Sequence, residues 1–208
     1  MKNRVIGLTG QTGAGKSTVA EFARELSCEV ISADAVAREA LEKGSDVLKT
    51  LADLFGCDII DSEGNCVRSL LAQRAFSSRE NTELLNRTTH PWIISRTREY
   101  IENTEPGRLI IFDAPQLFES GGEVLCGSVI AVVAPEAVRL GRIMERDGIS
   151  REAALLRIRA QHDEAYYTGR ADYLIDGSMP KEQVKRETGR IITELLQAEV
   201  EHEEQKRY

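Results

Sequence analysis

The chain has 208 residues, 41% of them hydrophobic and 29% charged, which is an ordinary composition and long enough for one domain with a sizeable core. Its formal net charge of −7 argues against a nucleic-acid partner, because a non-specific nucleic-acid surface usually shows as a basic face. No apolar run approaches the length of a membrane span and the start of the chain lacks a leader pattern, so we expect a cytoplasmic protein without a membrane partner.

The first elements in chain order are a strand, a glycine-rich loop and a helix. RVIGLT (residues 4–9) is a short apolar run with β-branched residues, and STVAEFAREL (17–26) follows the glycines with helical spacing. A second short apolar run precedes a helix expected over 34–44, with Asp34 as its N-cap and Gly44 as its stop. These elements begin a βαβ pattern.

The middle of the chain, from about residue 45 to residue 106, reads mostly as helix, and we interpret it as a helical insertion. It contains one hairpin-like piece at 57–67. Parallel-strand signals return at 108–115 and 128–135 as near-continuous apolar runs, which are typical of strands buried on both faces of a sheet. A last short run at 172–176 precedes the final helix.

This alternation predicts one α/β domain over residues 1–208, built on a doubly wound parallel sheet with right-handed crossovers. Ligands in such folds bind at the carboxyl ends of the strands. The charged tail at 199–208 is expected to be a solvated, fraying end.

The segment after the first strand satisfies the phosphate-loop pattern G-x-x-x-x-G-K-[ST] in full, and the flanking strand and helix argue against an accidental glycine-rich turn. Its glycines let the N–H groups curl inward and approach phosphate oxygens without a Cβ in the way. Lys16 is expected to span the β- and γ-phosphates, and the Ser17 hydroxyl is expected to bind Mg²⁺. We therefore predict that ATP is bound by Gly10, Thr12, Gly13, Ala14, Gly15, Lys16, Ser17 and Thr18.

Other sequence features favour a small-molecule kinase among phosphate-loop proteins. The chain has no guanine-reading [NT]-K-x-D segment, which argues against a GTPase, and ABC-type or motor ATPases would be longer or carry other signatures. Small-molecule kinases commonly have this length, a helical acceptor-binding insertion, here 45–106, and an arginine-bearing lid, here about 136–165. The P-loop kinase type of fold is therefore expected.

The arginines of the lid candidate are expected to serve catalysis. Arg142 and Arg146 are four residues apart, so on a helix they share one face and can both point at a polyphosphate, and Arg139 is expected to join them. The alternative is a solvated basic face paired with Glu145 and Asp147.

Short motifs follow one another nearly from end to end, in the order GLTGQTGAGKST, ISADAVAR, THP, FDAPQLFE, RIMERDGIS, RAQ and ADYLID. Together they resemble the dephospho-coenzyme A kinase family, and the A-D-x-x-A-R and D-x-P-x-L-F-E elements are much more specific than the phosphate loop. The resemblance implies transfer of the γ-phosphoryl group of ATP to the ribose 3′-hydroxyl of dephospho-CoA, the last step of coenzyme A synthesis.

Two carboxylates are candidates for the chemistry of this reaction. An alcohol acceptor needs a base within reach, and Asp34, at the end of the second strand beside the phosphate loop, is expected to supply it. The alternative for Asp34 is a plain helix N-cap, and that role is compatible with its role as the base. Asp113 closes a buried strand, where it is expected to position Mg²⁺ or water, and a strand-end turn residue is the alternative.

Two residues of the insertion match family positions and are expected to contact the acceptor. Arg68 is expected to hold an acceptor phosphate, with an ordinary surface arginine as the equal alternative. His90 is the other candidate, with a structural histidine as its alternative, and Pro91 is expected to kink or restart a helix around an exposed imidazole. Glu119 and Gln161 also match family positions, without a physical role that the sequence supplies.

The chain departs from the family pattern at three positions. Ser32 stands where the family usually has aspartate, Gln116 stands where it has leucine, and Gly177 replaces an asparagine whose amide could read the base. These departures leave two other functions open, namely a kinase for another nucleoside or nucleotide, and a nucleotide-binding regulator without transfer activity. Lys16, Asp34 and the Arg142/Arg146 pair argue against the regulator.

Overall fold

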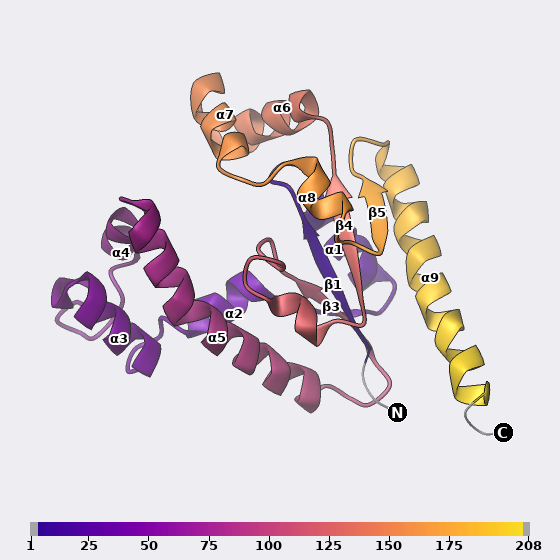
Figure 1. Cartoon of the computed structure of the whole chain (residues 1–208), viewed down its shortest axis with the longest axis horizontal. Coiled ribbons are helices and arrows are strands. Elements are labelled where there is room, and N and C mark those ends of the chain that lie inside the picture. The colour runs from indigo at the N-terminus through magenta and orange to yellow at the C-terminus, as the bar shows by residue number, and fades with distance from the viewer. Residues whose placement is uncertain (1–3, 206–208) are drawn as a thin grey trace.

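The computed structural model describes the backbone of residues 4–205 and the side chains of residues 4–197 (Figure 1). Its strands form one sheet in the order β2-β3-β1-β4-β5, and every neighbouring pair is parallel, which confirms the predicted α/β class. The strands are β1 (Arg4–Gly10), β2 (Glu29–Ser32), β3 (Leu109–Asp113), β4 (Ser128–Val133) and β5 (Tyr173–Asp176).

Helices connect these strands and cover the sheet. The helices are α1 (Lys16–Glu25), α2 (Ala33–Glu39), α3 (Asp46–Phe55), α4 (Arg68–Ala75), α5 (Arg79–Asn103), α6 (Glu136–Asp147), α7 (Arg151–Arg159), α8 (Glu164–Thr168) and α9 (Lys181–Gln205), with short 3₁₀ turns η1 (Cys57–Ile59) and η2 (Gly122–Leu125). Within the described part of the chain, no helix is long and apolar enough to cross a membrane.

Successive strand residues pack into two hydrophobic cores, one on each face of the sheet. Ile6 of β1 and Ile111 of β3 pack with α1 and α9, whereas Val5 and Ile110 pack with α2 and α5 on the opposite face. Side chains alternate across a strand, so a strand covered on both faces must be apolar at nearly every position. This explains the uninterrupted apolar runs in the sequence and makes the sheet a rigid support for the loops at its carboxyl edge.

The segment between β2 and β3 is mostly helical, as predicted, and lies to one side of the sheet (Figure 1). Helices α3, α4 and α5 enclose a hydrophobic core of their own, in which Leu48, Leu51 and Ile59 are almost completely buried. The hairpin-like piece is reduced to one antiparallel bridge between Ile60 and Cys66.

The end of α2 differs from the sequence prediction, because this helix stops at Glu39 and does not reach Gly44. The Ser45 hydroxyl donates to the Ala40 carbonyl at 2.6 Å, and it also accepts from Leu48 N–H at the start of α3. One serine therefore joins the end of α2 to the beginning of α3, while Gly44, with φ of 84°, makes the turn between them.

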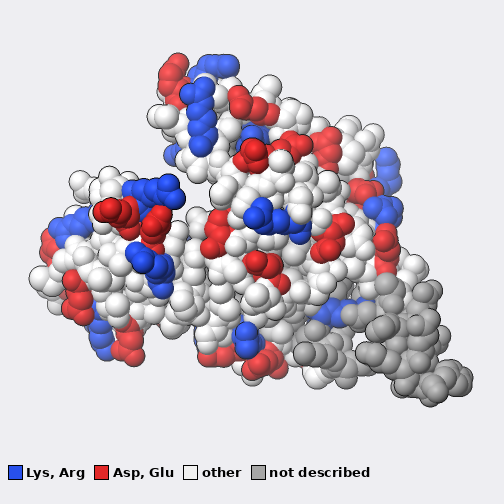
Figure 2. Space-filling model, in the orientation of Figure 1, with Lys and Arg blue, Asp and Glu red and all other residues white. Residues whose placement is uncertain are grey.

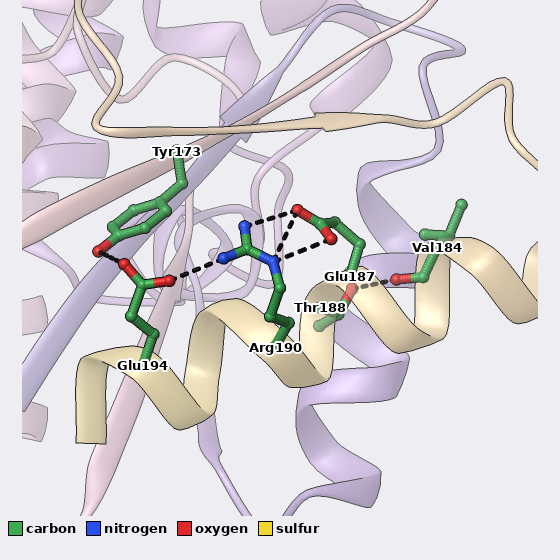
Figure 3. A network of polar contacts seen from close by, with 6 residues as sticks. All are labelled: Tyr173, Val184, Glu187, Thr188, Arg190 and Glu194. Atoms are coloured by element: carbon green, nitrogen blue, oxygen red, sulfur yellow. Dashed lines mark hydrogen bonds and ion pairs between the residues drawn. The ribbon is translucent and has the colours of Figure 1, made fainter. Parts of the chain in front are cut away.

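A network of polar contacts lies on α9, and one of its hydrogen bonds reaches β5 (Figure 3). The Tyr173 hydroxyl donates to Glu194 at 3.2 Å, and the Arg190 guanidinium donates to Glu194 and to Glu187, both at 2.7 Å. The bond from Tyr173 joins the first residue of β5 to α9, whereas the contacts of Arg190 lie within the helix. The expectation of a solvated tail over 199–208 concerns side chains that lie outside the described residues.

Candidate active site

The phosphate loop connects β1 to α1, and its glycines are required by the backbone. Gly10, Gly13 and Gly15 have φ values of 150°, 77° and 107°, where side chains are rarely tolerated. A Cβ on Gly10 would collide with the Val132 carbonyl, and one on Gly13 would lie 2.9 Å from the Arg139 carbonyl oxygen. Helix α1 begins at Lys16 without a side-chain cap, so its first N–H groups are open to a ligand.

Gln161 supports the loop from a distant part of the sequence. Its Oε1 accepts a hydrogen bond of 2.7 Å from Thr12 N–H. Gln161 follows α7, so this bond ties the chain after α7 to the rim of the phosphate loop. The sequence placed Gln161 only as a family position, because a contact across 149 residues leaves no local signal.

A cavity of about 620 Å³ opens at the carboxyl edge of the sheet. Figure 2 also shows the surface hollowed between the helices α3–α5 and the helices α6 and α7, with charged side chains of both signs around the hollow. The cavity is lined by Gly10, Gln11, Thr12, Gly13, Gly15, Lys16, Ser17, Thr18, Asp34, Pro115, Arg142, Arg146, Gln161, Gly177, Met179, Lys181 and Val184. Most of the residues predicted to bind nucleotide therefore share one space, whereas Ala14 contributes a buried side chain to the core beneath it.

Lys16 and Asp113 form an ion pair within the site. Both side chains are largely buried, with exposures of 17% and 15%. Asp113 is the last residue of β3, which pairs with β1, so its carboxylate stands next to the phosphate loop. A lysine on a flexible stem can leave this partner for a stronger anion such as a polyphosphate.

Asp34 lies in the first turn of α2, but it is not the N-cap. The cap is Ser32, whose hydroxyl accepts from Ala35 N–H at 3.4 Å. The prediction of Asp34 as N-cap was therefore wrong, because the cap lies two residues earlier, at Ser32, and the helix begins at Ala33. This shift leaves the Asp34 carboxylate exposed and lining the cavity.

Arg142 binds the back of the phosphate loop. Its guanidinium donates to the carbonyl oxygens of Gly13 and Ala14 at 3.2 and 3.1 Å, and to that of Gly177 at 2.8 Å. Gly177 is pressed against the loop, because a Cβ there would overlap the Ala14 carbonyl oxygen. Arg142 therefore joins α6, the phosphate loop and the turn after β5.

Arg146, one turn further along α6, is exposed and paired with its neighbour Asp147 at 2.7 Å. Arg157 of α7 binds the same carboxylate, and hydrogen bonding from Arg146 is the main reason that the pKa of Asp147 lies below its ordinary value. Arg146 and Arg142 both line the cavity, as one helix face would allow. An ion-paired, solvated face was the alternative to a catalytic role for these arginines. Arg146 does pair with Asp147, and it also lines the cavity.

Arg139 does not join the other two arginines, contrary to the prediction. It is only 6% exposed, and its Nε and Nη1 atoms find no hydrogen-bond partner among the described residues. Burial lowers the pKa of its guanidinium. The reason is its place on α6, where its backbone packs against Gly13 of the phosphate loop.

The two residues predicted to contact the acceptor lie elsewhere, on the helices between β2 and β3. His90 is half-buried on α5, which runs through Pro91 without restarting, so the exposed imidazole was a wrong expectation. Burial lowers the pKa of His90, and a hydrogen bond with the Gln116 side chain opposes that shift. Arg68 is exposed at the start of α4. Neither is among the described residues that line the cavity.

Oxygen ligands suited to Mg²⁺ are present beside the phosphate loop. Ser17 offers an exposed hydroxyl in the cavity, and Asp113 offers a carboxylate next to Lys16. Mg²⁺ takes few protein oxygens and completes its shell with water and substrate phosphates, so this donor set fits it. Within residues 4–205, no three His, Cys, Asp or Glu side chains gather into a metal-binding group.

Comparison with known proteins identifies similar chains along almost the whole length. The sequence model of the family described as dephospho-CoA kinase matches residues 4–183. The dephospho-CoA kinase of Corynebacterium diphtheriae is 42% identical over 88% of this chain and 92% of that protein. The dephospho-CoA kinase of Syntrophotalea carbinolica is 37% identical over 92% of each chain.

Solved structures agree with this similarity. A Thermus thermophilus structure is 32% identical, with a TM-score of 0.79 over 94% of this chain and 99% of that one. The dephospho-CoA kinase of Campylobacter jejuni has a TM-score of 0.70 and 28% identity, over 95% and 99%. Shikimate kinase from Bacteroides thetaiotaomicron, at 18% identity and a TM-score of 0.55 over 93% and 98%, shares the fold, which confirms the P-loop kinase type.

Proposed function

This chain belongs to the dephospho-coenzyme A kinase family, and from this premise we propose that it transfers the γ-phosphoryl group of ATP to the ribose 3′-hydroxyl of dephospho-CoA, completing coenzyme A. The observation that carries the proposal is a single cavity that joins a complete phosphate loop to the carboxylate of Asp34. Phosphate binding and removal of a hydroxyl proton are the two tasks that such a transfer requires.

The phosphates of ATP are held by the N–H groups of the phosphate loop and by the positive end of α1. Lys16 exchanges its Asp113 partner for the β- and γ-phosphates. This exchange is supported by the position of the ion pair beside the loop and by the flexible stem of lysine.

Asp34 acts as the general base of the transfer. The acceptor hydroxyl gives its proton to the Asp34 carboxylate, its oxygen forms a bond to the γ-phosphorus, and the bond from that phosphorus to the β,γ-bridging oxygen breaks, so that ADP leaves. The exposure of Asp34 and its place in the cavity support this role.

The two arginines of α6 have different roles. Arg146 supplies positive charge to the moving phosphoryl group, because it lines the cavity and its exposed side chain pairs with one described residue, Asp147. Arg142 acts mainly by fixing the phosphate loop, since its guanidinium is already occupied by three carbonyl oxygens.

Ser17 and Asp113 would hold Mg²⁺ at the phosphates. When bound, this ion neutralises charge on the β- and γ-phosphates. The Asp113 carboxylate, which pairs with Lys16 in this structure, would be available to the ion if Lys16 paired with the phosphates instead.

The helical segment at 45–106 is proposed to bind the acceptor, and the region at about 136–165 is proposed to be the lid. Arg68 and His90 would contact dephospho-CoA when the helices α3–α5 approach the cavity, since neither lines it here. The cytoplasm, where ATP is available, is the proposed location.

A coupled ADP-release assay over a panel of acceptors tests the proposal. Dephospho-CoA is expected to give the highest kcat/KM, with a product identified as coenzyme A by mass spectrometry. Faster turnover with a nucleoside or nucleoside monophosphate would indicate another nucleotide kinase. ATP binding in calorimetry without ADP release on any acceptor would indicate a regulator.

A further inference from the structure

The order of the strands divides the cavity into two ends. The phosphate loop follows β1 in the middle of the sheet, Asp34 follows β2 on one side, and Gly177 follows β5 on the other. In-line transfer places the acceptor and the leaving nucleoside diphosphate on opposite sides of the moving phosphoryl group. Under the proposed function, on which this inference rests, the acceptor lies on the Asp34 side and the base of the donor lies on the β5 side.

The side chains at the β5 end offer little that could tell one purine from another. Met179 and Val184 are apolar, and Lys181 carries an ammonium group, which donates hydrogen bonds but accepts none. Gly177 has no room for a side chain, because a Cβ would overlap the Ala14 carbonyl oxygen. The two carboxamides of the lining, Gln11 and Gln161, belong to the phosphate loop and to the chain after α7, and the Arg142 guanidinium beside Gly177 already donates to three carbonyl oxygens.

Three N–H groups of the turn after β5 are committed to internal hydrogen bonds. Gly177 N–H donates to the Val133 carbonyl at 2.8 Å, and Ser178 N–H donates to the Asp176 carboxylate at 2.8 Å. Met179 N–H donates to the Asp176 carbonyl at 3.3 Å. These N–H groups are therefore not free to donate to N1 of adenine, which is an acceptor that guanine lacks.

We propose that the base site discriminates weakly between adenine and guanine, so that GTP also serves as phosphoryl donor. Adenine and guanine both present N7 as an acceptor, but guanine adds the O6 acceptor where adenine has an amino donor. The Lys181 ammonium group can donate a hydrogen bond to O6 of guanine. With GTP the γ-phosphoryl group passes to the acceptor hydroxyl by the same bond changes, and GDP leaves in place of ADP.

Initial rates with ATP and with GTP, at saturating dephospho-CoA, measure the discrimination. The kcat/KM value with GTP is expected to lie within about tenfold of the value with ATP, because a pocket without directed polar contacts rejects a similar ligand by only about a hundredfold or less. A preference for ATP above about a hundredfold would overturn the inference while leaving the proposed function in place.

Calorimetric binding of the non-hydrolysable analogues AMPPNP and GMPPNP decides the question even if no transfer to dephospho-CoA is observed. Similar dissociation constants support weak discrimination, and binding of AMPPNP alone contradicts it. A protein that binds both analogues but transfers nothing would refute the proposed function and keep this inference.

Variants of Lys181 test the residue assigned to O6. Lys181→Ala is expected to raise the KM for GTP more than the KM for ATP, and Lys181→Gln, which supplies an acceptor, is expected to shift preference toward ATP. Lys185→Ala is the matched control, because Lys185 also lies over the Phe22 ring but pairs with Glu25 and is not among the described lining residues. Equal changes for both nucleotides in Lys181→Ala would show that Lys181 does not read the base.

Discussion

Lys16 is the residue whose charge the proposed reaction uses most directly. Lys16→Ala removes the cation from the β- and γ-phosphates without disturbing the hydrophobic core, so turnover is expected to fall by at least about a hundredfold. The fold is expected to remain, because Lys16 contributes only the ion pair with Asp113 in the described structure. ADP release and circular dichroism of the variant provide the two measurements. Turnover at the wild-type level would refute the phosphate-loop assignment.

Asp34 is exposed and lines the cavity, which suits a general base. Asp34→Asn is expected to lower kcat by about a hundredfold or more with little change in ATP affinity, since only proton transfer is lost. The helix should survive the change, because Ser32 and not Asp34 caps α2. If ATP binding collapsed while turnover at saturation was kept, Asp34 would belong to the donor site.

At the scale of the element, α6 is fixed at its middle and exposed at its end. Arg142 holds it to the phosphate loop, whereas Arg146 pairs only with Asp147, which Arg157 shares. Arg146→Ala is expected to cut kcat by about a hundredfold while changing the dissociation constant of dephospho-CoA only modestly, because charge on the moving group develops in the transition state. Arg146→Lys should rescue little, since a point charge cannot reproduce a planar fork.

Arg157→Ala is the matched control for this helix. It removes the other ion pair of Asp147, the one made from α7. Arg157 is not among the described residues that line the cavity. Arg139 of the same helix is unsuitable as a control, because it is buried and its loss would disturb packing. Small and equal losses in the Arg146 and Arg157 variants would mean that this face is only a solvated basic surface.

Residues from elements across the whole chain line the cavity, so a nucleotide bound there should stabilise the native state. A non-hydrolysable ATP analogue at about a hundredfold above its Kd adds about 2.7 kcal/mol to the free energy of unfolding. For a chain of this size that corresponds to a rise in Tm of about 5–10 °C. Thermal denaturation with and without the analogue measures it. Lys16→Ala should reduce the rise, and an equal rise in both proteins would contradict the role of Lys16 in binding.

The sequence by itself determined the parts of this protein that depend on local pattern. Apolar runs predict strands because both faces of the sheet are buried, and the spacing of Gly10, Gly13 and Gly15 predicts the loop because only glycine adopts its backbone angles. The order of the short motifs along the chain was sufficient to predict the family correctly. Local pattern works here because each of these features is imposed within a few residues.

Only the tertiary structure decided which distant groups meet. Gln161 accepts a hydrogen bond from Thr12, and Arg142 donates to the carbonyl of Gly177. Arg139 is buried, although its spacing from the other arginines gave no sign of burial. Such contacts depend on how helices settle on the sheet, and a side chain's partner across the fold is not encoded by its neighbours in sequence. The physical reason is that packing fixes the direction of each helix face, whereas periodicity fixes only which residues share one.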